Sequence, residues 1–265
     1  MAGGSMDYQD KKYCLLDDKK LEAEKILYYR TVDSTSLAIH RNAALSENYY
    51  TVVAEEQNKG RGRRGRDWFS PPGCGLWFSI LLKPSMLKPE NAQAITLITG
   101  AVIANHLNEK YEISSTIKWP NDLILNGKKL GGILTEMKGY QTKIDYIVAG
   151  IGLNVNQKPA DFPELLKPLA TSLFIETGRL FDRTELLISI RKALLKAYEI
   201  FYRQGFAPFH NLWLELNETT GKIITLIWSG KSLTGKVIDL SENGSLVVED
   251  EHGFIHNVNY GEIKN

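Results

Sequence analysis

The stretch EEQNKGRGRRGRDWFSP at residues 55–71 is the most informative part of this chain. Its centre, residues 59–66, holds five cations and three glycines in eight consecutive positions. Glycines let main-chain N–H groups approach a ligand closely, and arginine side chains offer forked donors that match carboxylate and phosphate. Apolar runs on both sides, at 50–54 and 75–82, are typical of strands. We therefore predict a clamp for a polyanion, with a solvated basic loop as the alternative.

Regular hydrophobic patterns extend in both directions from this loop. Runs rich in β-branched and aromatic residues predict strands at 26–30, 50–54, 75–82, 116–118, 123–125, 130–136 and 146–154. Helical spacing and capping residues predict helices at about 33–45, 91–110, 184–204 and 209–216. Asn126-Gly127, between two of the apolar runs, is a strong hairpin signal. This mixture of helices and strands indicates an α+β fold.

The pattern changes after Asn217. Short β-rich runs then alternate with turn pairs such as Asn243-Gly244 and His252-Gly253. This spacing predicts a small barrel of about five strands. We place a domain boundary near 217–221, which divides the chain into an N-terminal segment, a large domain and a small C-terminal domain at 1–25, 26–218 and 219–265. The first five residues, MAGGS, resemble a cloning remnant.

A second polar motif, KWPND at 118–122, stands before the predicted hairpin. Pro120 favours an extended residue before it, which presents Lys118 and the Asn-Asp pair at the start of the hairpin. A lysine beside such a turn is a suitable point charge for a phosphate. Glycines within apolar strands, at 131–132 and 150–152, leave room either for a flat ligand on the sheet or for close helix packing.

The composition excludes several classes of protein. Hydrophobic residues make up 43% and charged residues 24% of the 265 residues, as in a folded globular chain. The formal net charge of +1 gives no global attraction to nucleic acid or an anionic membrane. No apolar run reaches the roughly 20 residues of a membrane span, and the N-terminus lacks a secretory signal pattern. With two widely spaced cysteines, Cys14 and Cys74, we expect a cytoplasmic protein with reduced thiols.

Motifs for several common chemistries are missing from the sequence. It holds no Walker-type Gly-Lys-Ser/Thr, no Rossmann glycine fingerprint and no His-Glu-x-x-His, and nothing resembles a nucleophile–base–acid triad. The five histidines are scattered, and His252 and His256 fall in a predicted hairpin. The sequence therefore assigns no metal ligands.

The basic loop and the KWPND motif together resemble the biotin protein ligase family. Residues 55–71 are similar to the biotin and adenylate loop of that family. Residues 118–122, followed by 129–134, are similar to its second signature. Asp33-Ser34-Thr35 resembles its early biotin contact, and 150–154 resembles its inner strand.

These motifs stand in family order from about Tyr28 to the C-terminus. Many members carry an amide residue after Ser-Thr, where this chain has Ser36, so the role of position 36 stays open. The resemblance implies a mixed sheet with helices, similar to class II aminoacyl-tRNA synthetase catalytic domains, followed by an SH3-like barrel. It also implies an AMP-forming biotin–[biotin carboxyl carrier protein] ligase, which makes biotinyl-5′-adenylate from biotin and ATP and then biotinylates a carrier lysine.

The same resemblance implies roles for individual residues. Catalysis is expected from Lys118 and Arg63. Biotin is expected to contact the early Ser-Thr motif, the loop and the glycine strands, through Ser34, Thr35, Ser36, Gln57, Gly60, Arg61, Gly62, Arg63, Lys118, Gly131, Gly132 and Gly152. ATP is expected to contact Arg61, Arg63, Arg66, Trp68, Lys118, Asn121 and Asn154. Mg²⁺ is expected to accompany ATP, with unknown protein ligands.

The expected partner is a biotin carboxyl carrier protein or the corresponding domain of a biotin-dependent carboxylase. We expect a monomer or homodimer that binds no membrane and no specific DNA. Fewer than about 30 residues precede the first strand, too few for a DNA-binding winged helix. Their one possible helix, at about 19–28, is expected to have no second helix to pack against. The alternatives are a lipoate–protein ligase and a non-enzymatic protein that binds RNA through the Arg-Gly loop.

Overall fold

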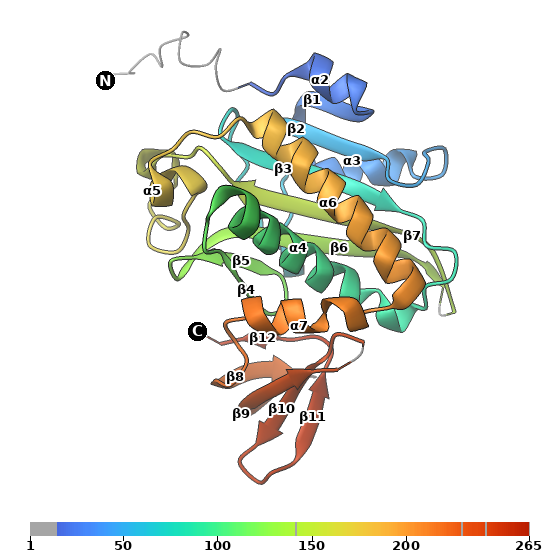
Figure 1. Ribbon diagram of the computed structural model, residues 1–265, viewed down its shortest axis with the longest axis vertical. Coiled ribbons are helices and arrows are strands. Elements are labelled where there is room, and N and C mark those ends of the chain that lie inside the picture. The colour runs from blue at the N-terminus through green and yellow to red at the C-terminus, as the bar shows by residue number, and fades with distance from the viewer. Residues whose placement is uncertain (1–14, 141, 229, 242, 265) are drawn as a thin grey trace.

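The computed structural model describes residues 15–140, 142–228, 230–241 and 243–264 (Figure 1). The expectations for residues 1–14, including the cloning remnant and Cys14, lie outside these ranges. A seven-stranded mixed sheet carries helices on both faces, and a separate five-stranded sheet follows at the C-terminal end. The predicted α+β architecture is confirmed.

The large sheet has the strand order β1-β2-β3-β7-β6-β5-β4. Its strands are β1 (Ile26–Val32), β2 (Thr51–Gln57), β3 (Gly75–Leu82), β4 (Thr116–Lys118), β5 (Asp122–Leu125), β6 (Lys128–Tyr140) and β7 (Lys143–Asn154). Only β1 and β2 run parallel among these strand pairs. The interior strand β3 is buried along its whole length, because both faces of the sheet are covered at this point.

The helices cover the two faces of this sheet unequally. They are α2 (Asp18–Ala23), α3 (Thr35–Asn42), α4 (Gln93–Tyr111), α5 (Leu173–Thr177), α6 (Arg183–Gln204) and α7 (Ala207–Leu216), with short 3₁₀ turns η1 (Arg63–Gly65), η2 (Pro89–Asn91) and η3 (Pro159–Asp161). The long helices α4 and α6 pack side by side over one face (Figure 1). Helix α3 covers the other face, where Ile39 packs with Val52. Val53 enters the main core instead, because side chains alternate along a strand.

Helix α2 departs from the expectation for the N-terminal segment. It ends at Ala23 and not near residue 28, because the chain continues there as β1. It also has a helix to pack against, since Lys20 Nζ lies 2.8 Å from Glu185 Oε1 on α6. Leu21 is fully buried in the main core. The prediction of an isolated helix at 19–28 is therefore wrong.

The C-terminal sheet contains the five strands that the turn pairs predict. They are β8 (Ile223–Trp228), β9 (Lys231–Leu240), β10 (Leu246–Asp250), β11 (Ile255–Val258) and β12 (Glu262–Ile263), in the antiparallel order β11-β10-β9-β8-β12. Gly230, Gly244 and Gly253 adopt the left-handed backbone that such turns require. The sheet remains open within the part of the chain that is described, with β11 and β12 as its two edges. None of the described helices is long and apolar enough to cross a membrane.

Candidate functional site

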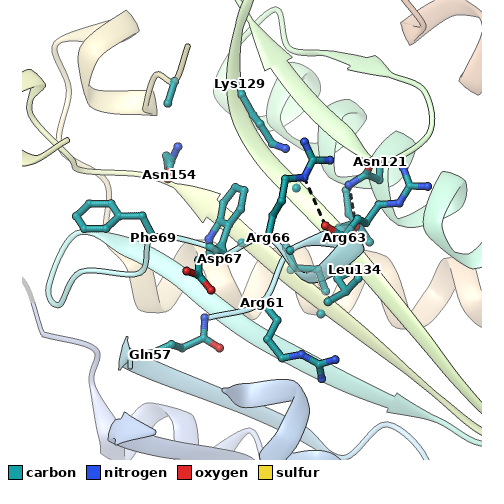
Figure 2. Close-up of a pocket in the computed structure, with 18 of the residues that line it drawn as sticks. Gln57, Arg61, Arg63, Arg66, Asp67, Phe69, Asn121, Lys129, Leu134 and Asn154 are labelled. Atoms are coloured by element: carbon teal, nitrogen blue, oxygen red, sulfur yellow. Dashed lines mark hydrogen bonds between the residues drawn. The ribbon is translucent and has the colours of Figure 1, made fainter. Parts of the chain in front are cut away.

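A cavity of about 290 Å³ lies where the basic loop crosses the large sheet (Figure 2). Strands β6 and β7 supply its floor, and the start of α3 and the end of β2 supply one side. The loop between β2 and β3 covers it, and apolar residues of the 158–170 segment complete the wall. The lining residues are Ser34, Thr35, Ser36, Gln57, Arg61, Gly62, Arg63, Arg66, Asp67, Trp68, Phe69, Asn121, Lys129, Gly132, Ile133, Leu134, Gly150, Ile151, Gly152, Asn154, Phe162, Leu166, Leu169 and Ala170.

Most of the predicted site residues meet in this cavity, but Gly60, Lys118 and Gly131 do not line it. Lys118 lines a neighbouring cavity of about 10 Å³, which shares Asn121 with the large one. Gly131 is packed among its neighbours in the sheet, since an added Cβ would lie 2.7 Å from the Gly152 carbonyl oxygen and 3.1 Å from Leu123 Cδ1. Gly60 lies within the loop and is enclosed by its neighbours, since an added Cβ would lie 2.3 Å from the Trp68 carbonyl oxygen.

The polar end of the cavity is formed by the first residues of α3. Ser34 is the N-cap, and Ser34, Thr35 and Ser36 are all at least 95% buried. The amide N and the Oγ1 of Thr35 both donate to Gln57 Oε1, at 2.8 and 3.1 Å. Gln57 Nε2 in turn donates to Ser70 Oγ at 2.9 Å. Neutral hydrogen-bonding groups are therefore held in fixed directions at this end.

Three of the cations that line the cavity lie on the loop that covers it, and the fourth, Lys129, lies on β6. Figure 2 shows Arg66 and Lys129 on one side of the cavity and Gln57 on the other. Arg61 pairs with Glu136 of β6 at 2.9 Å, and Arg66 pairs with Glu262 of β12 at 3.2 Å. These cations are more than two-fifths exposed and already paired with carboxylates. An incoming polyanion can replace those carboxylates at small cost, because exposed ion pairs are weak.

Arg63 is the most enclosed arginine of the loop. Its Nη1 donates to Asn121 Oδ1 at 3.0 Å and its Nη2 to the Gly261 carbonyl oxygen at 3.4 Å. Burial lowers the pKa of the Arg63 guanidinium, and the adjacent charge of Arg64 lowers it further. A cation that is desolvated and close to other cations favours an anionic ligand at this position.

The indole of Trp68 lies on the glycine strands. A Cβ added to Gly152 would come within 2.4 Å of Trp68 ring atoms, and one added to Gly132 within 3.2 Å. These glycines were expected to make room for the ring of biotin, and in this structure they make room for Trp68. The Trp68 Nε1 is buried and has no hydrogen-bond partner among the described residues. Lys129 Nζ lies 5.4 Å from the centre of the indole, within the range of a cation–π contact.

Several cavity residues were not among those predicted from the sequence. Lys129 belongs to the second signature, but the pattern does not reveal that its ammonium reaches the cavity and lies 2.7 Å from Asp122 Oδ1. Phe162 and Leu169 come from a loop whose sequence shows only a proline-containing connection. No sequence signal identifies these two residues, because their place depends on how the loop folds back over the sheet. The described residues contain no cluster of three or more His, Cys, Asp or Glu side chains that suits a metal ion.

Comparisons with known proteins agree over both parts of the chain. The model of the Biotin/lipoate A/B protein ligase family matches residues 27–154, and that of the Biotin protein ligase C terminal domain matches 219–264. The chain is 34% identical to the bifunctional ligase/repressor BirA of Bacillus subtilis over 231 residues, which cover 87% of this chain and 71% of the relative. It is 30% identical to the biotin--[acetyl-CoA-carboxylase] ligase of Paracoccus denitrificans, over 84% of this chain and 93% of that one.

A solved structure shares the fold over nearly the whole described chain. The biotin protein ligase of Aquifex aeolicus, determined in complex with biotin and ATP, superposes with a TM-score of 0.78 at 34% identity. The match covers 91% of this chain and 98% of that protein. The likeness therefore includes the large sheet and the C-terminal sheet together.

Proposed function

The chain belongs to the biotin protein ligase family, and on this premise we propose that it joins biotin to ATP and then to a carrier lysine. The observation that carries the proposal is the composition of one cavity. Neutral hydrogen-bonding groups around Thr35 and Gln57 lie at one end, and Arg63 and Arg66 lie across the cavity from them. Arg61 also lines the cavity and pairs with Glu136 of β6. Such a cavity suits a small ligand with a polar head that must meet a polyphosphate.

In the first step a carboxylate oxygen of biotin attacks the α-phosphorus of ATP. A bond forms between that oxygen and phosphorus, the bond to the β-phosphate breaks, and pyrophosphate leaves. The carboxylate is already ionised near neutral pH, so the enzyme needs no general base. What it must supply is alignment and neutralisation of phosphate charge. Arg61, Arg63 and Arg66 supply the neutralisation by exchanging their present partners for phosphate oxygens.

In the second step the carrier lysine attacks the acyl carbon of biotinyl-adenylate. An amide bond forms, the acyl–phosphate bond breaks, AMP leaves and the amine loses a proton. That amine must be neutral to react, although its ordinary pKa is about 10.4. The carrier is a biotin carboxyl carrier protein or carboxylase domain, as the name of the Paracoccus relative indicates for that enzyme. That the chain acts as a monomer or homodimer in the cytoplasm, without binding specific DNA, remains a prediction.

Mg²⁺ would accompany ATP in this reaction. The described residues offer no cluster of carboxylates that forms a metal cage, so phosphate oxygens and water would supply most of its ligands. Its chemistry would be to neutralise phosphate charge beside the arginines.

Lys118 is the lysine assigned to the reacting carboxylate in this proposal, because it belongs to the KWPND motif. It lies opposite Asp122 on the neighbouring strand and lines the small cavity that shares Asn121 with the large one. The other candidate for this role is Lys129, whose charge is already balanced by Asp122. Lys118→Ala should lower pyrophosphate release on the order of 10²–10³-fold. Lys129→Ala should lower it about fivefold or less. A larger loss for Lys129→Ala would transfer the role to that residue.

The proposed activity is tested by pyrophosphate release with ATP and either biotin or lipoate. Release with biotin, and none above background with lipoate, is the expected result. Release with lipoate alone would favour the lipoate ligase alternative, since the matched family model includes both kinds of enzyme. The match of 219–264 to a biotin protein ligase C-terminal domain, and the names of the relatives, favour biotin.

A further inference from the structure

A chain of buried hydroxyl groups runs behind the polar end of the cavity. Ser79 of β3 is fully buried and does not line the cavity. Its Oγ lies 2.7 Å from Thr35 Oγ1 and 3.0 Å from Ser36 Oγ, and both of those residues do line the cavity. Each hydroxyl carries a single proton to donate and two lone pairs to accept. The direction of every bond in the chain can therefore be worked out by counting protons.

The count starts at the backbone N–H of Thr35, which can only donate. It lies 2.8 Å from Gln57 Oε1, and this contact sets the orientation of the Gln57 amide. Ser70 agrees with that orientation, since it accepts from Gln57 Nε2 and donates to the Trp68 carbonyl oxygen at 3.1 Å. Gln57 Oε1 is thus an acceptor, and the Thr35 hydroxyl, 3.1 Å away, must donate its proton to it.

The remaining two bonds follow from that donation. Because the Thr35 proton is used on Gln57, Ser79 must donate to Thr35. Because the Ser79 proton is used on Thr35, Ser36 must donate to Ser79. The Ser36 hydroxyl therefore has no proton left for the cavity and presents lone pairs there.

We infer that Ser36 determines specificity by accepting a hydrogen bond from an N–H of the ligand head group, and that Ser79 positions it for this role. The inference rests on the proposed function, which makes biotin the ligand, and it takes the ureido group of biotin as the head group that the polar end holds. It assigns a role to the position where many family members carry an amide. An amide offers both a donor and an acceptor, whereas Ser36 offers only an acceptor in this arrangement.

Gly150 of β7 supports the assignment independently. A Cβ added at this position would lie 2.7 Å from Ser36 Oγ and 3.5 Å from Ser79 Oγ. The glycine therefore leaves the space that the paired hydroxyls occupy. Since Gly150 also lines the cavity, a ligand atom beside it lies next to Ser36.

The test compares biotin with two cyclic carbamates, in each of which oxygen replaces one ureido N–H. Calorimetric titration of the full chain, without ATP, gives the dissociation constants. The parent should bind biotin about tenfold more tightly than the carbamate whose oxygen faces Ser36, because that oxygen leaves the acceptor unsatisfied. Ser36→Ala should reduce this preference to about threefold or less by weakening biotin binding alone.

Ser79→Ala separates the positioning role from simple loss of packing. Without Ser79 the Ser36 proton is released, so the hydroxyl can turn and donate to the carbamate oxygen. The preference should then shrink through tighter carbamate binding, whereas a packing defect would weaken all three ligands equally. Thr99→Val, which removes a fully buried hydroxyl from α4, is the matched control and should leave the preference unchanged.

The outcomes separate the inference from the proposed function. Failure of the parent to bind biotin would contradict the proposed function. Tight biotin binding with the same preference in the parent, Ser36→Ala and Ser79→Ala would overturn the inference alone.

Discussion

The two ends of the cavity hold their polar groups in opposite ways. At the α3 end, Thr35 and Gln57 are largely enclosed, neutral and hydrogen-bonded to one another. On the covering loop, Arg61 and Arg66 are exposed cations paired with carboxylates of distant strands. A buried neutral network is costly to rearrange and so selects a shape, whereas exposed ion pairs exchange partners easily. In the proposed function, the enclosed network selects the small ligand and the exposed arginines bind the phosphates.

The largest loss of activity is expected from removing Arg63, the one arginine of the loop that is largely enclosed. Arg63→Ala should lower the rate of biotin-dependent pyrophosphate release on the order of 10²–10³-fold, because it removes a desolvated charge from the phosphate end. Its neighbour Arg64 pairs with Glu262 and does not line the cavity, so Arg64→Ala is the matched control. Equal losses in the two variants would show that only the total charge of the loop matters. Biotin affinity without ATP should change little in either.

A second variant fills the space on the cavity floor that the Trp68 indole occupies. Gly152→Ala places a Cβ within 2.4 Å of Trp68, so the indole must leave its position, at a cost of about 1–3 kcal/mol. Gly100→Ala in α4 is the control, since its Cβ would meet only ordinary contacts at 3.6 Å. That change should be neutral or stabilise by up to about 1 kcal/mol. Chemical denaturation measures both, and equal stability of the two variants would refute the proposed packing.

A smaller effect concerns the carboxylate that holds Arg61. A hydrogen bond from His40, together with the charge of Arg61, lowers the pKa of Glu136 below its ordinary value of 4.5. A lowered pKa stabilises the fold above pH 4.5, and this contribution is lost as the pH falls through the folded-state pKa. Glu136→Gln should therefore cost about 1 kcal/mol or less at pH 7. The difference should shrink in thermal melts as the pH falls below 4.5, and a difference that stays constant with pH would contradict the assignment.

The smallest effect is expected where the loop meets the C-terminal sheet. Glu262 pairs with Arg64 and Arg66, and all three side chains are more than 40% exposed. Glu262→Gln should weaken this contact by about 0.2–1 kcal/mol and speed amide hydrogen exchange across residues 60–66 up to about fivefold. Added salt should remove most of the difference by screening the pairs. Slower exchange in the variant would mean that Glu262 does not hold the loop.

The sequence predicted turns and helix ends correctly where the conformation depends on a few neighbouring residues. Asn126 and Gly127 both adopt positive φ in the predicted hairpin, and Gly205 ends α6 as expected. The fold class and family followed from several motifs in a fixed order. Helix α5 was missed, because five residues behind the capping Ser172 give too short a pattern to recognise.

The sequence could not predict which residues of a strand or loop point into the cavity. Gly131 and Gly132 look alike in the sequence, yet only Gly132 lines the cavity. Lys118 and Lys129 belong to the same motif region, and the structure brings Lys129 to the large cavity. In the sequence Ser79 is a single polar residue in an apolar strand. Its contact with Thr35 forms only when α3 packs against β3. Faces are set by tertiary packing, which a local pattern does not contain.

The most direct test of the account is the mass of a carrier domain after incubation with the chain, ATP and biotin. The account predicts a mass increase of one biotin at one lysine, dependent on ATP and strongly reduced by Arg63→Ala. The same incubation with lipoate should leave the carrier unmodified. An unmodified carrier in the presence of biotin and ATP, or equal modification by lipoate, would contradict it.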